Sequence, residues 1–157
     1  MTIKISKILC PTDFSELSVH SLRYARAFAA TFEAQIHCIH VVDEAYQHWN
    51  AMGPEGAPLA PPLEDLTTYA VTHMQQFADE HLVGLKYAPV TKVMSGRPAD
   101  EIVQYALEKT IDLIIIATHG RGGLAHALLG STVDKVVRKS TCPVLVVREQ
   151  EHEFIKS

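Results

Sequence analysis

The stretch "DLIIIATHGRGGLAHALLGST", residues 112–132, places a continuous apolar run directly before a glycine-rich segment and a second small-residue group. The apolar run, like the run "PVLVV" at residues 143–147, predicts a β-strand that is covered on both faces, as in a parallel sheet. The common phosphate loop has a lysine before its Ser or Thr, whereas here Ser131 follows Gly130 at once. Gly120, Gly122 and Gly123 also lack the further glycine of a dinucleotide fingerprint.

Outward from this stretch, the chain alternates between strand-like and helix-like patterns. The strand-like segments are residues 4–10, 34–42, 87–96, 112–118 and 142–148, and the helix-like segments are 14–32, 63–82, 97–110 and 131–140. Within the segment 14–32, Ser15 is a candidate N-cap and Ser18 begins another acceptable turn. Strands separated by helices predict an α/β domain with a parallel sheet and right-handed crossovers. In such sheets, ligands bind beyond the carboxyl ends of the strands, where the strand order reverses. Residues 10–13 and 117–123 are therefore candidate walls of a site.

Length and composition predict one domain over residues 1–150 and a short tail over 151–157. Residues 43–62 are rich in Pro and Gly, and we expect a mobile loop there. The net charge is −4 and no long basic run occurs, which argues against a nucleic-acid partner. No apolar stretch approaches the roughly 20 residues of a membrane span, so we expect no membrane segment.

The three cysteines, Cys10, Cys38 and Cys142, include no C-x-x-C pair. We expect reduced thiols, a cytoplasmic location and small core residues at strand positions. His37 and His40 are three apart on a predicted strand and should face opposite sides of the sheet, so we expect no metal held by protein ligands.

Two amide-rich corners are expected at the same end of the sheet. Glycines at 120, 122 and 123 let backbone approach a ligand closely, and Gly130-Ser131-Thr132 begins a helix whose free N–H groups favour an anion. Arg121 would add charge from the rim, and Mg²⁺ would be carried by the phosphates. The alternatives are an ordinary loop at the glycines, a helix N-cap at Ser131, and an Asx turn or N-cap at Asp13.

The spacing of these residues resembles the signature G-x2-G-x9-G-[ST] of the universal stress protein family, with Ala117, Gly120, Gly130 and Ser131 at the four positions. The segments "ILCPTDFSE", "IHVVD", "SGRPADEIVQYA" and "CPVLVVR" extend the resemblance over nearly the whole chain. It implies a Rossmann-like α/β fold with a five-stranded parallel sheet of order 3-2-1-4-5. It also implies a homodimer, or a higher oligomer, formed through the last strand at about residues 143–148.

The family resemblance further implies an ATP site. Asp13 and Val41 would hold the adenosine end, and Pro11 and Thr12 would shape that corner. The ribose and phosphates would be surrounded by Ala117, Thr118, His119, Gly120, Arg121, Gly122, Gly123, Gly130, Ser131, Thr132 and Val133.

Ala117 stands where the family signature has its first glycine, and its methyl group is harmless if φ stays negative. The expected function is that of an ATP-binding regulatory protein of the stress response, acting through dimer and partner contacts. The alternatives are a slow ATP hydrolase, for which the phosphate corner offers no convincing carboxylate base, and a nucleotide-free interaction domain.

Overall fold

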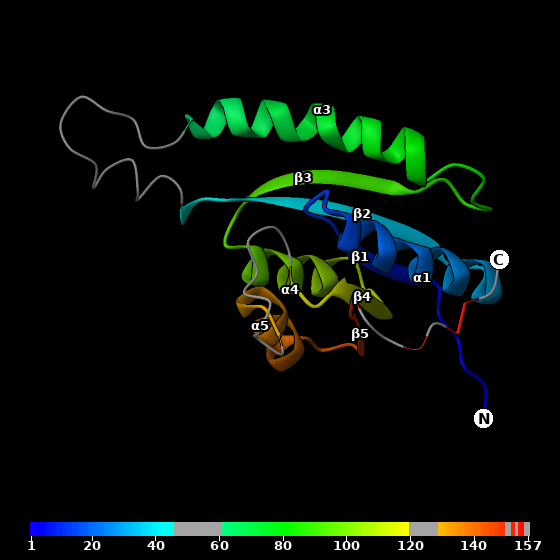
Figure 1. Cartoon of the computed structure of the whole chain (residues 1–157). Helices are drawn as coiled ribbons and strands as arrows, with labels where there is room; N and C mark the ends of the chain where they lie inside the picture. The colour runs from blue at the N-terminus through cyan, green and yellow to red at the C-terminus, as the bar shows by residue number, and fades with distance from the viewer. Residues whose placement is uncertain (46–60, 120–128, 150–151, 153, 156–157) are drawn as a thin grey trace.

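Five parallel strands form one sheet in the order β3-β2-β1-β4-β5, which confirms the expected fold class and strand order. The computed structural model describes residues 1–45, 61–119, 129–149, 152 and 154–155 (Figure 1). The strands are β1 (Lys7–Pro11), β2 (Gln35–Asp43), β3 (Val90–Gly96), β4 (Leu113–Ala117) and β5 (Val144–Val147). The helices are α1 (Glu16–Phe32), α3 (Leu63–His81), α4 (Pro98–Glu108) and α5 (Ser131–Lys139). Most of the predicted loop, residues 46–60, lies outside the described residues.

Helices cover both faces of the sheet, so the molecule has three layers and two cores (Figure 1). On one face of the sheet, α1 and α3 pack against every second side chain of each strand, such as Ile8, Cys38 and Ile115. On the other face, α4 and α5 pack against the side chains in between, such as Leu9 and Ile114. This division follows from the alternation of side chains along each strand.

The two edges of the sheet differ from its centre. All five residues of β4 are buried, as its apolar run predicts. In β5 only Val147 is buried, and the three residues before it are half-buried, so the prediction of full cover on both faces is wrong for this strand. The reason is its place at the edge, where one side has no neighbouring strand. At the other edge, β3 begins directly after Pro89, as expected for a residue with no N–H to donate.

Helix ends confirm one capping prediction and correct another. Ser15 is the N-cap of α1, and its hydroxyl accepts a hydrogen bond from the Ser18 N–H. Gly130, rather than Ser131, is the N-cap of α5, so Ser131 is the first helical residue. Within the described residues, no helix is long and apolar enough to cross a membrane.

Two of the three cysteines occupy the predicted core positions. Cys10 and Cys38 are buried on strands, and burial raises the pKa of the Cys10 thiol to about 12. Both thiols are therefore neutral core groups. Cys142 is half-buried and precedes β5, so the expectation of a core strand position is wrong for this residue.

Candidate functional site

The strand order reverses direction between β1 and β4, which are parallel neighbours in the centre of the sheet. After β1 the chain enters α1 on one face, and α5, which follows β4, packs on the opposite face. Chains that leave adjacent strands toward opposite faces open a crevice at the carboxyl edge. We call its walls the β1 corner, residues 11–15, and the β4 corner, residues 117–119 and 130–133.

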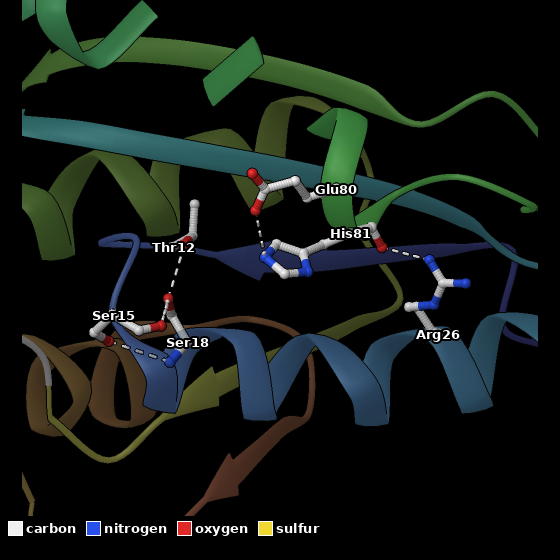
Figure 2. Close-up of polar contacts among 6 residues, drawn as sticks. All are labelled: Thr12, Ser15, Ser18, Arg26, Glu80 and His81. Carbon is white, nitrogen blue, oxygen red and sulfur yellow. Dashed lines mark hydrogen bonds and ion pairs between the residues drawn. The ribbon is translucent and has the colours of Figure 1, made fainter. Parts of the chain in front are cut away.

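Hydrogen bonds around Thr12 fix the β1 corner. The side chain of Thr12 is 6% exposed, and its N–H donates to the Ile39 carbonyl at 2.8 Å. Its hydroxyl accepts from the Phe14 N–H at 3.0 Å and shares a 2.9 Å hydrogen bond with the Ser18 hydroxyl (Figure 2). Thr12 therefore shapes the corner by holding β1, β2 and α1 together, and its hydroxyl is already engaged within the protein.

Asp13 forms an Asx turn at the entrance to α1. Its Oδ1 accepts hydrogen bonds from the Ser15 N–H at 3.0 Å and from the Ser15 hydroxyl at 2.5 Å. Of the two structural roles considered for Asp13, the Asx turn is confirmed and the N-cap belongs to Ser15. The turn orients the half-buried carboxylate at the mouth of the crevice.

The backbone of Val41 faces the crevice because of the sheet register. The backbone N–H and C=O groups of odd-numbered β2 residues point toward β1. The Gln35 N–H donates to the Ser6 carbonyl, and the Ile39 carbonyl accepts from the Thr12 N–H. Since β1 ends at the level of Ile39, the N–H and C=O of Val41 are directed beyond its end. One donor and one acceptor side by side can match the exocyclic amine and an adjacent ring nitrogen of adenine.

In the β4 corner, the start of α5 lies directly against the end of β4. The Gly130 N–H donates to the Thr118 carbonyl at 2.7 Å, and the Thr118 N–H donates to Val147 at 2.9 Å. A Cβ at position 130 would lie 3.0 Å from the Thr118 carbonyl oxygen and 3.3 Å from His119 Cα. This close approach favours glycine, since any larger residue would have to push backbone atoms of β4 or α5 aside.

Free backbone donors and two unpaired side-chain atoms gather at this corner. The first turn of α5 leaves the N–H groups of Ser131, Thr132 and Val133 without helical acceptors, because its first bond joins the Asp134 N–H to Gly130. Thr118 Oγ1 and His119 Nδ1 are buried and have no hydrogen-bond partner in the part of the chain that the structure describes. A polar ligand would satisfy such groups.

The remaining predicted site residues are placed as follows. Ser131 is exposed and Thr132 half-buried in the first turn of α5. The side chain of Val133 is buried in the core beneath α4 and α5, so only its backbone is left for a ligand. Gly120, Arg121 and residues 122–123 lie outside the described residues.

Ala117 leaves the start of α5 unobstructed. The described non-glycine residues with positive φ are Phe14, Glu33 and Thr110, so the φ of Ala117 is negative. Ala117 is two residues after Ile115 on β4, so its methyl group lies on the same face of the sheet as the Ile115 side chain, which packs on the α1 face. The methyl group therefore points to the face opposite α5.

Sequence reasoning missed His40 and Ser18, both of which hold the β1 corner. His40 Nδ1 lies 2.7 Å from the Thr12 carbonyl oxygen, although the sequence suggested only a test for metal binding. The sequence predicts Ser18 only as a turn residue, because its contact with Thr12 depends on how α1 packs on β1. Neither contact can be predicted from a spacing in the sequence, because each joins residues of two separate elements.

A separate pocket lies between α1 and α3 and includes none of the predicted site residues. Its volume is about 290 Å³, and it is lined by Val19, Leu22, Arg23, Arg26, Glu80, His81 and Val83. Arg26 donates to the His81 carbonyl in the last turn of α3 (Figure 2). A guanidinium group at the carbonyl end of a helix stabilises the helix, which gives this residue a structural role.

Comparison with known proteins gives the same assignment along almost the whole chain. Residues 4–148 match the model of the universal stress protein family. Universal stress protein MJ0531 of Methanocaldococcus jannaschii is 34% identical over 149 residues, which cover 94% of this chain and 84% of that protein.

Solved structures have the same fold. The structure of MJ0577 from the same organism has a TM-score of 0.78 and 31% identity, covering 96% of this chain and all of that one. A universal stress protein in complex with cAMP has a TM-score of 0.65 at 21% identity, covering 93% of this chain and 98% of that one. One from Archaeoglobus fulgidus in complex with dAMP has a TM-score of 0.58 at 19% identity, covering 92% and 98%. With its strand order, its two corners and these matches, the chain belongs to the universal stress protein family.

Proposed function

We propose that this protein binds ATP in the crevice between the β1 and β4 corners and that the bound nucleotide regulates its contacts in a stress response. The observation that carries the proposal is the hydrogen bond from the Gly130 N–H to the Thr118 carbonyl. This bond places the positive end of the α5 dipole at the end of a central strand, beside the point where the strand order reverses.

The phosphate end of the site would be held by backbone amides and hydroxyls. The free N–H groups of the first turn of α5 and the hydroxyls of Ser131 and Thr132 are donors for phosphate oxygens. The residues of the two predicted phosphate segments include Arg121 but no lysine. Mg²⁺ would be carried by the phosphates, since this ion keeps several waters and needs few protein ligands.

The adenosine end would be held at the β1 corner. The carboxylate of Asp13 can accept a hydrogen bond from a ribose hydroxyl or an adenine amine, and the Val41 backbone offers one donor and one acceptor. Two universal stress proteins of this fold were solved with cAMP and dAMP, which supports an adenine nucleotide as the ligand class.

Calorimetric titration of nucleotide-free protein with ATP and Mg²⁺ tests the proposal. We expect saturable binding, and we expect mass spectrometry to detect an adenine nucleotide released on denaturation of the purified protein. Absence of ATP binding at millimolar concentration, with no released nucleotide, would favour the nucleotide-free interaction domain.

A slow ATP hydrolase is the second candidate, and the β4 corner gives it less support. Hydrolysis needs a base beside a phosphate-bound water. The carboxylate in the first turn of α5, Asp134, forms an ion pair with Arg138 at 3.0 Å. Steady release of ADP that a Gly130→Ala/Ser131→Ala double variant abolishes would support this second candidate.

The regulatory part of the proposal involves the β5 edge. Val144, Leu145 and Val146 are only half-buried there, and an apolar edge strand is a liability unless it is covered. Pairing of β5 with its copy across a two-fold axis, in a cytoplasmic homodimer, would cover it. Sedimentation velocity with and without ATP measures both the dimer and its response to nucleotide.

A further inference from the structure

His40 contacts the backbone on one side of Asp13. It lies on β2, and its Nδ1 is 2.7 Å from the carbonyl oxygen of Thr12 on the neighbouring strand. Because a carbonyl oxygen only accepts hydrogen bonds, Nδ1 carries the proton in this contact. The bond joins residues 28 apart in the sequence and fixes the end of β1 relative to β2.

The same imidazole ring supports the residue on the other side of Asp13. Phe14 has a φ of 65°, in the left-handed region that a bulky residue rarely adopts. Its ring stacks on His40 with a centroid distance of 4.5 Å and an interplanar angle of 29°. The rings of His73 and Phe77 on α3 also contact the Phe14 ring, with centroid distances of 5.6 and 5.7 Å.

His40 thus holds the chain both before and after Asp13, and it directly precedes Val41. An unfavourable backbone conformation costs about 1–3 kcal/mol and persists only where its surroundings impose it. The stacked ring and the hydrogen bond from the Phe14 N–H to Thr12 Oγ1 supply that constraint. Ser15 holds the carboxylate of Asp13 and β3 pairs with Val41, so the contribution of His40 is to fix the chain around Asp13 relative to the strand that carries Val41.

We infer that His40 is a positioning residue that holds both contacts to the adenosine end of the nucleotide in register, with its Nδ1–H group as the essential element. The inference rests on the proposed ATP site. It assigns the recognition of the base to the bond between His40 and the Thr12 carbonyl, whereas the phosphates are held by the β4 corner.

Two substitutions separate the functions of the imidazole ring. His40→Phe keeps a ring to stack on Phe14 and removes the donor, whereas His40→Asn places an amide donor near the position of Nδ1 and removes the ring. His73→Phe is the matched control, because His73 contacts the same Phe14 ring from α3. The affinities for ATP and GTP are measured by calorimetry, and the melting temperature of each variant is recorded.

We expect His40→Phe to weaken ATP binding about tenfold and GTP binding clearly less, since one hydrogen bond to the corner is lost and the ribose is common to both nucleotides. His40→Asn should recover ATP affinity to within about threefold of the native protein, as the donor is restored. The control should bind both nucleotides like the native protein. Guanine is the discriminating probe because its exocyclic oxygen accepts where the adenine amine donates.

Three results would overturn the inference while leaving ATP binding intact. These are native ATP affinity in His40→Phe, equal losses for ATP and GTP, and an Asn variant no better than the Phe variant. Should His40→Phe fail to fold, the Asn variant and nitrogen NMR of the native imidazole still decide. An Nε2–H tautomer would contradict the assigned donor, and a native protein that binds no ATP would remove the proposed function and this inference together.

Discussion

The two walls of the crevice differ in how completely their polar groups are paired. In the β1 corner, Thr12 and Ser18 bond to each other, and Asp13 bonds to Ser15. In the β4 corner, Thr118 Oγ1 and His119 Nδ1 are buried without a partner among the described residues. The first corner is complete within the protein, whereas the second has groups that a ligand could pair.

This difference indicates that the two corners have different roles in the proposed site. A corner whose hydrogen bonds are satisfied is already ordered, so it loses little entropy when a base and a ribose bind. A corner with free amides at a helix start attracts phosphate through the dipole and those donors. Substitutions in the β1 corner should therefore affect stability first, and substitutions in the β4 corner should affect nucleotide affinity first.

The largest effect is expected from Thr12→Val. The change keeps the shape of the side chain but leaves the Phe14 N–H without its acceptor and removes the hydroxyl that bonds to Ser18, whose own proton goes to the Ser15 carbonyl. We expect a loss of about 2–3 kcal/mol in the free energy of unfolding, measured by urea denaturation. The control is Thr72→Val on the exposed face of α3, for which we expect less than about 0.5 kcal/mol. Equal effects of the two variants would contradict a pre-ordered β1 corner.

The next effect is expected from Gly130→Val in the β4 corner. A Cβ there meets the Thr118 carbonyl oxygen and His119 Cα, so the start of α5 must move away from β4. We expect at least about a tenfold loss of ATP affinity, with a lower melting temperature as well, because the hydrogen bond from the Gly130 N–H to the Thr118 carbonyl is disturbed. Val137→Ala, an exposed substitution further along α5, should leave affinity unchanged. Native affinity in the Gly130 variant would remove the contact on which the proposed site depends.

A smaller effect is expected in the pH dependence of the free energy of unfolding. It depends on a buried histidine that belongs to neither corner. Burial lowers the pKa of His37, whose Nδ1 shares a 2.9 Å hydrogen bond with the Tyr105 hydroxyl on the α4 face. Because the unfolded state binds a proton more readily than the folded state, stability should fall as pH drops below the ordinary pKa of histidine. Urea denaturation across the acid range should show a flatter loss of stability in His37→Asn than in the native protein, and identical profiles would contradict the role of His37.

The smallest effect is expected from Ser131→Ala. Ser131 is exposed at the first position of α5 and is not its N-cap, so its hydroxyl contributes little to helix stability. Loss of one donor to a phosphate should weaken ATP binding about two- to fivefold. Calorimetry measures the affinity, and thermal unfolding should show no change. A clear fall in melting temperature would mean that the hydroxyl has a structural role after all.

Much of the fold could be predicted from local patterns. The apolar run of β4, the amphipathic face of α3 and the N-cap at Ser15 are each read within a few residues, and each is confirmed. Predictions that depend on neighbours in space were less accurate. The N-cap of α5 is Gly130 and not Ser131, and β5 is less covered than its apolar run predicts, because capping and edge exposure depend on how elements meet.

The site divides in the same way. The sequence predicted the residues of the proposed site, because a spacing of glycines and hydroxyls is a local pattern, and the resemblance to a known family supplied the strand order and the expected ligand class. It did not reveal that the side chain of Val133 is buried, nor that His40 supports the β1 corner. Both facts arise from the packing of one element against another.

By itself, the sequence determined which segments form strands and helices and which residues gather at the carboxyl edge, because hydrophobic period and turn chemistry act over short distances. Only the tertiary structure decided that the Ala117 methyl group faces away from α5, that Gly130 contacts the end of β4, and that one imidazole holds the chain on both sides of Asp13. Those outcomes depend on strand register and layer packing, which bring together residues that no local pattern connects.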